Sequence, residues 1–86
     1  MAHVILPSLL ATEAGGRKRF ELDVATVGEA LRALPVSDLV LDERGNLRRL
    51  VNVYVDGVDV REREGLETPL GGEETVQLIG AVAGGS

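Results

Sequence analysis

Residues 26–35 read TVGEALRALP and hold the helix around which the predicted fold is built. Thr26 and Glu29 match a capping box, in which the threonine oxygen accepts a backbone amide from the first turn and the glutamate reaches back to the cap. The helix is expected to end at Pro35, which has no amide proton with which to continue it. One face is apolar and should pack on a sheet. That face consists of Val27, Ala30, Leu31 and Leu34.

Two strand patterns precede this helix. Residues 3–9 are apolar enough for a first strand, in which Pro7 favours an edge position or a bend. Residues 12–17 form a loop whose glycines accept positive φ. Residues 19–24 alternate strictly between polar and apolar, as a half-buried strand does. The two strands together are expected to form a hairpin.

Three further strand patterns follow the helix. After a short helical turn at 37–42 and a loop at 43–46, residues 51–55 place three valines inward and Asn52 and Tyr54 outward. The Asp-Gly pair at 56–57 predicts a two-residue hairpin, because a type I′ turn needs positive φ at both positions. Residues 58–60 would be the short return strand, and residues 61–75 read as a loop. Residues 76–80 predict a last strand, with Ile79 outward.

The order of these elements predicts the architecture. Strand, strand, helix, strand, strand, strand suggests an α+β fold in which a mixed sheet of four to five strands carries one main helix on one face. The right-handed crossover rule then pairs the first and last strands in parallel at the centre. This is a β-grasp arrangement. We expect a β-grasp domain over residues 1–80 and a flexible C-terminal tail over residues 81–86.

Composition excludes several classes of function. The chain of 86 residues predicts one domain and contains no cysteine, which removes disulfides, thiolate catalysis and cysteine-based zinc sites. The net charge of −5 argues against nucleic acid as a partner. It would suit partners with basic grooves, although it also serves solubility, which we weight more heavily. No apolar run is long enough to span a membrane, so a cytoplasmic protein is expected.

The side chains that could carry chemistry do not predict an autonomous enzyme. His3 is the only histidine and has no second ligand nearby in sequence, so no metal site is predicted. Tyr54 and Ile79 should point away from the helix, and Val82 continues from that strand into the tail. These three residues predict a docking patch, since exposed aromatic and aliphatic side chains anchor interfaces. The alternative is that scattered apolar side chains are normal on a surface.

The tail ends in Gly84-Gly85, followed by Ser86. Glycine has no Cβ and adopts extended conformations freely, so a Gly85 carboxylate would be unhindered and could enter a narrow channel. Coupling that carboxylate to AMP would make a mixed anhydride that sulfide or an amine can attack, with a partner supplying the nucleotide site. A glycine-rich terminus can also be ordinary fraying.

On these residues the chain resembles the prokaryotic ubiquitin-like sulfur carriers, the ThiS/MoaD family. The similarity rests on residues 4–10 with the glycines at 15–16, on residues 50–57 with Val60-Arg61, and on the ending 81–85. These segments are most similar to the branch that serves cysteine biosynthesis. The resemblance implies that Gly85, with Gly84 beside it, is adenylated and converted to a thiocarboxylate that donates sulfur to cysteine or a related metabolite.

The resemblance also implies partners. An E1-like adenylyltransferase would use ATP, a synthase would accept the sulfur, and the carrier itself would bind no cofactor. Ser86 departs from the family ending, so a deubiquitinase-type metalloprotease is expected to remove it before Gly85 can react. Three alternatives stay open: a small subunit of molybdopterin synthase, a protein modifier conjugated through Gly85, and a β-grasp interaction module with an inert tail. Lys18 is the sole lysine, which disfavours a polymerising modifier.

Overall fold

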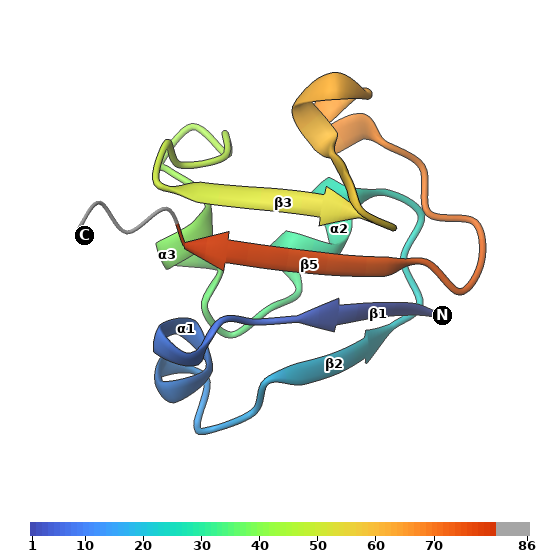
Figure 1. The fold of residues 1–86 in the computed structure, drawn as a ribbon. Helices are drawn as coiled ribbons and strands as arrows, with labels where there is room; N and C mark the ends of the chain where they lie inside the picture. The colour runs from blue at the N-terminus through green and yellow to red at the C-terminus, as the bar shows by residue number, and fades with distance from the viewer. Residues whose placement is uncertain (81–86) are drawn as a thin grey trace.

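A mixed sheet forms the front layer of the computed structural model, which describes residues 1–80 (Figure 1). Within those residues the sheet has five strands: β1 (Ala2–Ile5), β2 (Arg19–Leu22), β3 (Val51–Val55), β4 (Val58–Asp59) and β5 (Thr75–Gly80). Their order is β2-β1-β5-β3-β4. The central pair β1 and β5 is parallel, and the other pairs are antiparallel. This confirms the predicted β-grasp topology, including the parallel pairing of the first and last strands.

The predicted main helix is α2 (Val27–Arg32), which lies behind the sheet. The Thr26 side chain accepts the Glu29 amide at 3.2 Å, as the capping box predicts. The Glu29 carboxylate, however, accepts the amide of Ala25 at 3.0 Å, one residue before the cap. The last regular residue is Arg32, and Ala33 is the C-cap, so the helix ends before Pro35.

Two additional α-helices and two 3-10 turns accompany α2 in the described residues. These are α1 (Ser8–Glu13), α3 (Ser37–Val40), η1 (Val60–Glu62) and η2 (Gly65–Glu67). The helical turn predicted at 37–42 is therefore confirmed as α3. The region predicted as loop from residue 61 contains η1 and η2, and Val60 starts η1 instead of ending the short return strand.

The prediction of a first strand reaching residue 9 was wrong, because β1 ends at Ile5 and α1 begins at Ser8. Proline cannot donate a hydrogen bond to a ladder, and Pro7 adopts extended backbone immediately before α1. Its carbonyl accepts the Ala11 amide at 2.9 Å, which starts the helix. The apolar run at residues 8–11 thus continues in α1, and the predicted loop at 12–17 loses its first two residues to the same helix.

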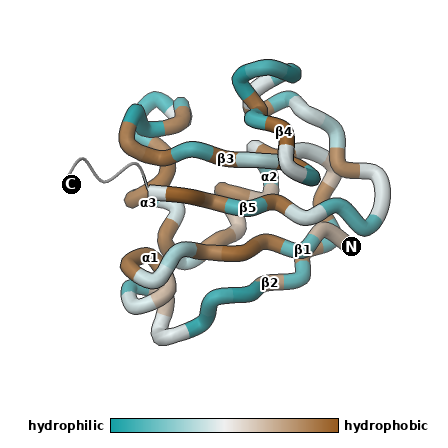
Figure 2. Tube along the Cα trace, viewed as in Figure 1, coloured by the Kyte–Doolittle hydropathy of each residue, from teal (hydrophilic) through white to brown (hydrophobic). Residues whose placement is uncertain are grey.

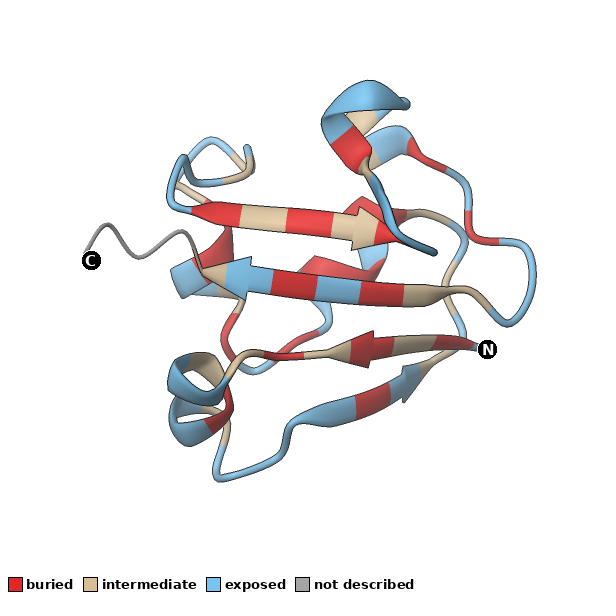
Figure 3. Cartoon of the chain, in the orientation of Figure 1, coloured by how far each residue is buried: buried red, intermediate tan, exposed pale blue. Residues whose placement is uncertain are grey.

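The core lies between the sheet and the helices. Strand residues alternate between buried and half-buried or exposed along β3 and β5 (Figure 3), with Val53, Val76 and Leu78 among the fully buried ones. Hydrophobic residues gather along β1 and β5 and in α1, whereas the turns are hydrophilic (Figure 2). In the described residues no buried side-chain nitrogen or oxygen lacks a hydrogen-bond partner.

The turn between β3 and β4 has φ of 50° at Asp56 and 87° at Gly57, as predicted for a type I′ hairpin.

Candidate functional site

Gly80 is the last described residue and the one to which the tail is attached. It ends β5, which is hydrogen-bonded between β1 and β3. Gly80 therefore lies in the middle of one end of the sheet and not at an edge (Figure 1). The predicted site residues Val82, Gly84, Gly85 and Ser86 lie outside the described residues. The structure describes the surfaces around Gly80, the residue that precedes them in sequence.

Tyr54 and Ile79 lie on the sheet face that α2 leaves open. Their neighbours along the strands are buried on the other side, whereas Tyr54 is half-buried and Ile79 is 41% exposed. Tyr54 is directly opposite Gln77, and Asn52 is directly opposite Ile79. Tyr54 and Ile79 are thus diagonal neighbours on adjacent strands, within reach of one another for an aromatic side chain. The open-face placement follows the predicted alternation, and docking itself stays a prediction.

Ile5 belongs to the same face and was missed by sequence reasoning. It is half-buried and lies opposite Gln77 on β5 and Arg19 on β2. Gln77 is therefore flanked by Ile5 on one strand and Tyr54 on the other. We call Ile5, Tyr54 and Ile79 the open-face patch. The alternation of β1 could have assigned Ile5 to this face, had the strand been placed correctly.

A fixed cation borders the open-face patch. The Arg61 guanidinium donates from Nη1 to Asn52 Oδ1 at 2.8 Å and from Nη2 to the Val51 carbonyl at 3.0 Å. Asp59 Oδ2 lies 3.7 Å from Nη1. The Arg61 side chain is nevertheless 45% exposed. Arginine held in this way loses little entropy on binding, which is one reason it is frequent in interfaces.

An apolar groove lies at the base of the tail. It has a volume of about 300 Å³ and is lined by Pro7–Leu10, Leu50, Val51 and Gly80. Leu9 and Leu50 are 70% and 63% exposed, the highest values for large apolar side chains in residues 1–80. Neither was predicted as a site residue, because Leu9 was placed in a strand and Leu50 has no periodic pattern to mark it. The groove joins α1 to the segment before β3 across the end of β5.

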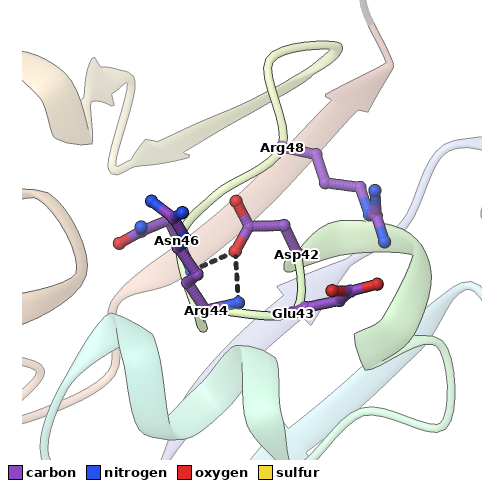
Figure 4. A pocket seen from close by; sticks show the side chains of 5 residues that line it. All are labelled: Asp42, Glu43, Arg44, Asn46 and Arg48. Atoms are coloured by element: carbon purple, nitrogen blue, oxygen red, sulfur yellow. Dashed lines mark hydrogen bonds between the residues drawn. The ribbon is translucent and has the colours of Figure 1, made fainter.

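A second hollow, of about 320 Å³, lies over the turn that follows α3 (Figure 4). Its lining carries both signs of charge, from Asp42, Glu43, Arg44 and Arg48. The Asp42 Oδ1 atom accepts the amides of Arg44 and Asn46, each at 2.9 Å. The Asp42 carboxylate therefore stabilises the turn, and we assign it a structural role.

His3, the only histidine of the chain, lies between two acidic side chains. His3 Nε2 lies 2.8 Å from Glu73 Oε1, and Nδ1 lies 3.6 Å from Glu21 Oε2. The hydrogen bond with His3, with a smaller effect from the N-terminal amine, holds the pKa of Glu73 below its ordinary value. No group of three metal-ligating side chains is found in this part of the chain. Within the same residues no helix is long and apolar enough to cross a membrane.

Comparison with known proteins identifies the family. The sequence matches the ThiS family over residues 4–85, nearly the whole chain and through the di-glycine. The chain belongs to the ThiS family. The sulfur carrier protein CysO of Mycobacterium tuberculosis is 34% identical over 95% of this chain and 96% of its own length. These findings confirm the resemblance on which the sequence interpretation rested.

Solved structures place this ThiS family member among β-grasp proteins. The crystal structure of M. tuberculosis CysO superimposes with a TM-score of 0.86 at 30% identity, over 95% of this chain and 100% of that one. CysO in the BexX/CysO complex of Amycolatopsis orientalis gives a TM-score of 0.82 at 32% identity, over 95% and 97%. The small archaeal modifier protein 1 of Methanosarcina acetivorans gives 0.80 at 25% identity, over 95% and 93%.

Proposed function

We propose that this chain is a sulfur carrier whose Gly85 carboxylate is adenylated and then converted to a thiocarboxylate. One observation carries the proposal: the ThiS family match runs through Gly84 and Gly85. The relatives named as sulfur carrier protein CysO support the same reading. We propose further that the sulfur serves the synthesis of cysteine or a related metabolite, in the cytoplasm where ATP is available.

The chemistry needs two steps at one carbon. The Gly85 carboxylate attacks the α-phosphorus of ATP, which forms a mixed anhydride with AMP and releases pyrophosphate. Sulfide then attacks the carbonyl carbon and AMP leaves, so that the carboxylate has exchanged one oxygen for sulfur. Both steps require an unhindered terminal carbonyl, which glycine provides. When the sulfur bonds to an acceptor bound by the synthase, water must then hydrolyse the bond between the Gly85 carbonyl and the acceptor, which supplies the missing oxygen and restores the carboxylate.

In this proposal the chain is a substrate and the partners are the enzymes. An E1-like adenylyltransferase binds ATP and receives the tail, and the open-face patch of Ile5, Tyr54 and Ile79 gives that enzyme a surface to hold. The patch reaches the base of the tail through one of its three members, since Ile79 precedes Gly80 on β5. A partner docked on the patch would therefore have the tail beside it. That a related CysO forms a complex with BexX supports the general expectation that the chain binds partner proteins.

Ser86 follows Gly85 and lies one residue beyond the family match. While Ser86 is attached, the carbonyl of Gly85 is an amide and has no free oxygen to attack ATP. We propose that a deubiquitinase-type metalloprotease hydrolyses the Gly85–Ser86 bond and exposes the carboxylate. Removal of this residue would convert an inert precursor to a working carrier.

A direct comparison tests the proposal. The full chain and a form that ends at Gly85 are incubated with the E1-like adenylyltransferase of the same organism, ATP and sulfide, and intact masses are taken. We expect the mass change of one oxygen-to-sulfur exchange in the form ending at Gly85 and no change in the full chain. Omission of ATP is the control. If the form ending at Gly85 gains no sulfur, carriage through this enzyme is ruled out.

Conjugation to other proteins is a second candidate, favoured by the likeness to a small archaeal modifier protein. The same adenylate would then be attacked by a lysine amine instead of sulfide. The chain offers Lys18 as its only lysine, so chains of the carrier linked through side chains would have that one acceptor. Peptides from cell extracts that carry Gly85 in an isopeptide bond would support this candidate over sulfur carriage.

A further inference from the structure

The topology of the sheet sorts the loop segments into two groups. Because β1 and β5 are parallel and β2 and β3 run against them, the starts of β2 and β3 lie at the same end of the sheet as Gly80, which we call the tail end (Figure 1). The starts of β1 and β5 lie at the opposite end, together with the ends of β2 and β3. Segments far apart in sequence are thereby grouped at each end.

The two ends carry opposite charges. At the tail end, basic residues precede or begin the strands, and all of them are exposed: Arg17, Lys18, Arg19, Arg48 and Arg49. We call this set the tail-end rim. At the opposite end the corresponding positions are acidic: Glu21, Asp23, Asp56, Glu73 and Glu74. Although the net charge of the chain is −5, the end of the sheet at Gly80 therefore carries a cluster of positive charges.

Part of the tail-end rim is held in place. The Arg17 guanidinium carbon lies 4.3 Å from the centroid of the Phe20 ring, and Arg48 Nε donates to the Asp38 carbonyl at 3.0 Å. The acids near these residues are Glu13 at the end of α1, Asp38 in α3, and Asp42 and Glu43 in the turn that follows α3. Of these, Asp42 accepts two backbone amides.

The apolar groove lies between the two basic segments. Across the strand order, residues 17–19 lead into β2, the groove spans the ends of β1 and β5, and residues 48–49 lead into β3. Leu9 and Leu50 project at this groove with little burial. An apolar centre with a charged rim is the usual anatomy of a protein interface. Here that centre includes Gly80, the residue that precedes the tail in sequence.

We propose that this end of the molecule docks against an acidic rim around the tail-binding channel of a partner protein, with Leu9 and Leu50 in apolar contact inside that rim. The inference rests on the proposed function, because it takes the partner to be the enzyme that receives the tail. Opposite charges raise association rates and orient the encounter. A dipolar carrier would thus approach with its tail leading, whereas its acidic end would be repelled.

Charge reversal with a matched control tests this proposal. Lys18→Glu with Arg49→Glu removes two rim cations that make no side-chain hydrogen bond or ion pair within residues 1–80. Arg32→Glu with Arg63→Glu makes the same change outside the rim, on exposed residues of α2 and of the segment between η1 and η2. Each pair shifts the net charge by −4, from −5 to −9. All variants are made in the form ending at Gly85, and thermal unfolding verifies the fold.

The association rate with the E1-like adenylyltransferase is measured by stopped flow from low to high salt. We expect the rim variant to associate about tenfold more slowly at low salt, with a difference that shrinks as salt screens the charges. The control variant should change by less than about threefold. If both variants associate equally slowly, or if neither is slowed, while the unmodified chain still gains sulfur, the docking proposal is overturned and the proposed function stands. If the unmodified chain gains no sulfur at saturating concentration, the proposed function fails, and this inference with it.

Discussion

Replacement of Ile79 with alanine is expected to weaken binding of the carrier to its activating enzyme about 30-fold. Ile79 is the most exposed member of the open-face patch and precedes the residue from which the tail leaves. An apolar anchor at the centre of an interface costs about 2 kcal/mol or more when truncated, which corresponds to about 30-fold in affinity. The loss should raise the KM for the carrier and leave the rate at saturation largely unchanged, because no reacting group is altered.

Val58→Ala is the matched control for that prediction. Val58 is 42% exposed, close to the value for Ile79, and is also a β-branched strand residue. Val58 lies on β4 directly opposite Val55 of β3, which is buried on the helix-covered face. Its side chain therefore faces the other side of the sheet from the patch. Its truncation should change KM by less than about twofold. If Val58→Ala and Ile79→Ala weaken binding equally, the open face is not the docking surface.

The largest expected loss of stability comes from Leu31→Ala. Leu31 lies on the inner face of α2 and has no exposed surface. Removal of its buried methyl groups forfeits their transfer free energy and leaves a cavity, which together cost about 2–5 kcal/mol. A domain of this size has a total stability on the order of 5–15 kcal/mol. We expect urea denaturation to show a correspondingly lower free energy of unfolding.

Leu9→Ala makes the same chemical change at a site that is 70% exposed in α1. Its effect on the free energy of unfolding should stay within about 0.5 kcal/mol, as for surface substitutions in general. A comparison of the two leucines separates burial from residue type. Similar losses for both would mean that the apolar face of α2 does not anchor the core as described.

Local patterns predicted those elements whose structure depends on neighbouring residues. The alternation at 51–55, the positive-φ pair Asp56-Gly57 and the Thr26 cap each depend on a few adjacent residues, and the structure bears out each of them. The first strand failed in part because a short apolar run fits either a strand or a helix. Pro7 decided the outcome by interrupting the ladder and preceding α1.

The composition of the surfaces could not be predicted in the same way. Ile5 joins the open face through its register with Gln77, and Arg61 reaches Val51 across ten positions of sequence. The tail-end rim exists only because strand direction groups residues 17–19 with residues 48–49. Each of these three features depends on contacts between residues far apart in sequence, which a local sequence pattern does not predict. The sequence did place Tyr54 and Ile79 on one face, because alternation within each strand was sufficient.

The most direct test of the central claim is to locate the transferred sulfur. The form ending at Gly85 is treated with the adenylyltransferase, ATP and isotopically heavy sulfide, then digested and sequenced by tandem mass spectrometry. Because the chain has no cysteine, no thiol side chain can hold the label. We predict heavy sulfur in the C-terminal peptide alone, on the carboxyl group of Gly85. Label on any other residue, or a C-terminal peptide of unchanged mass, would contradict the assignment of this chain as a thiocarboxylate carrier.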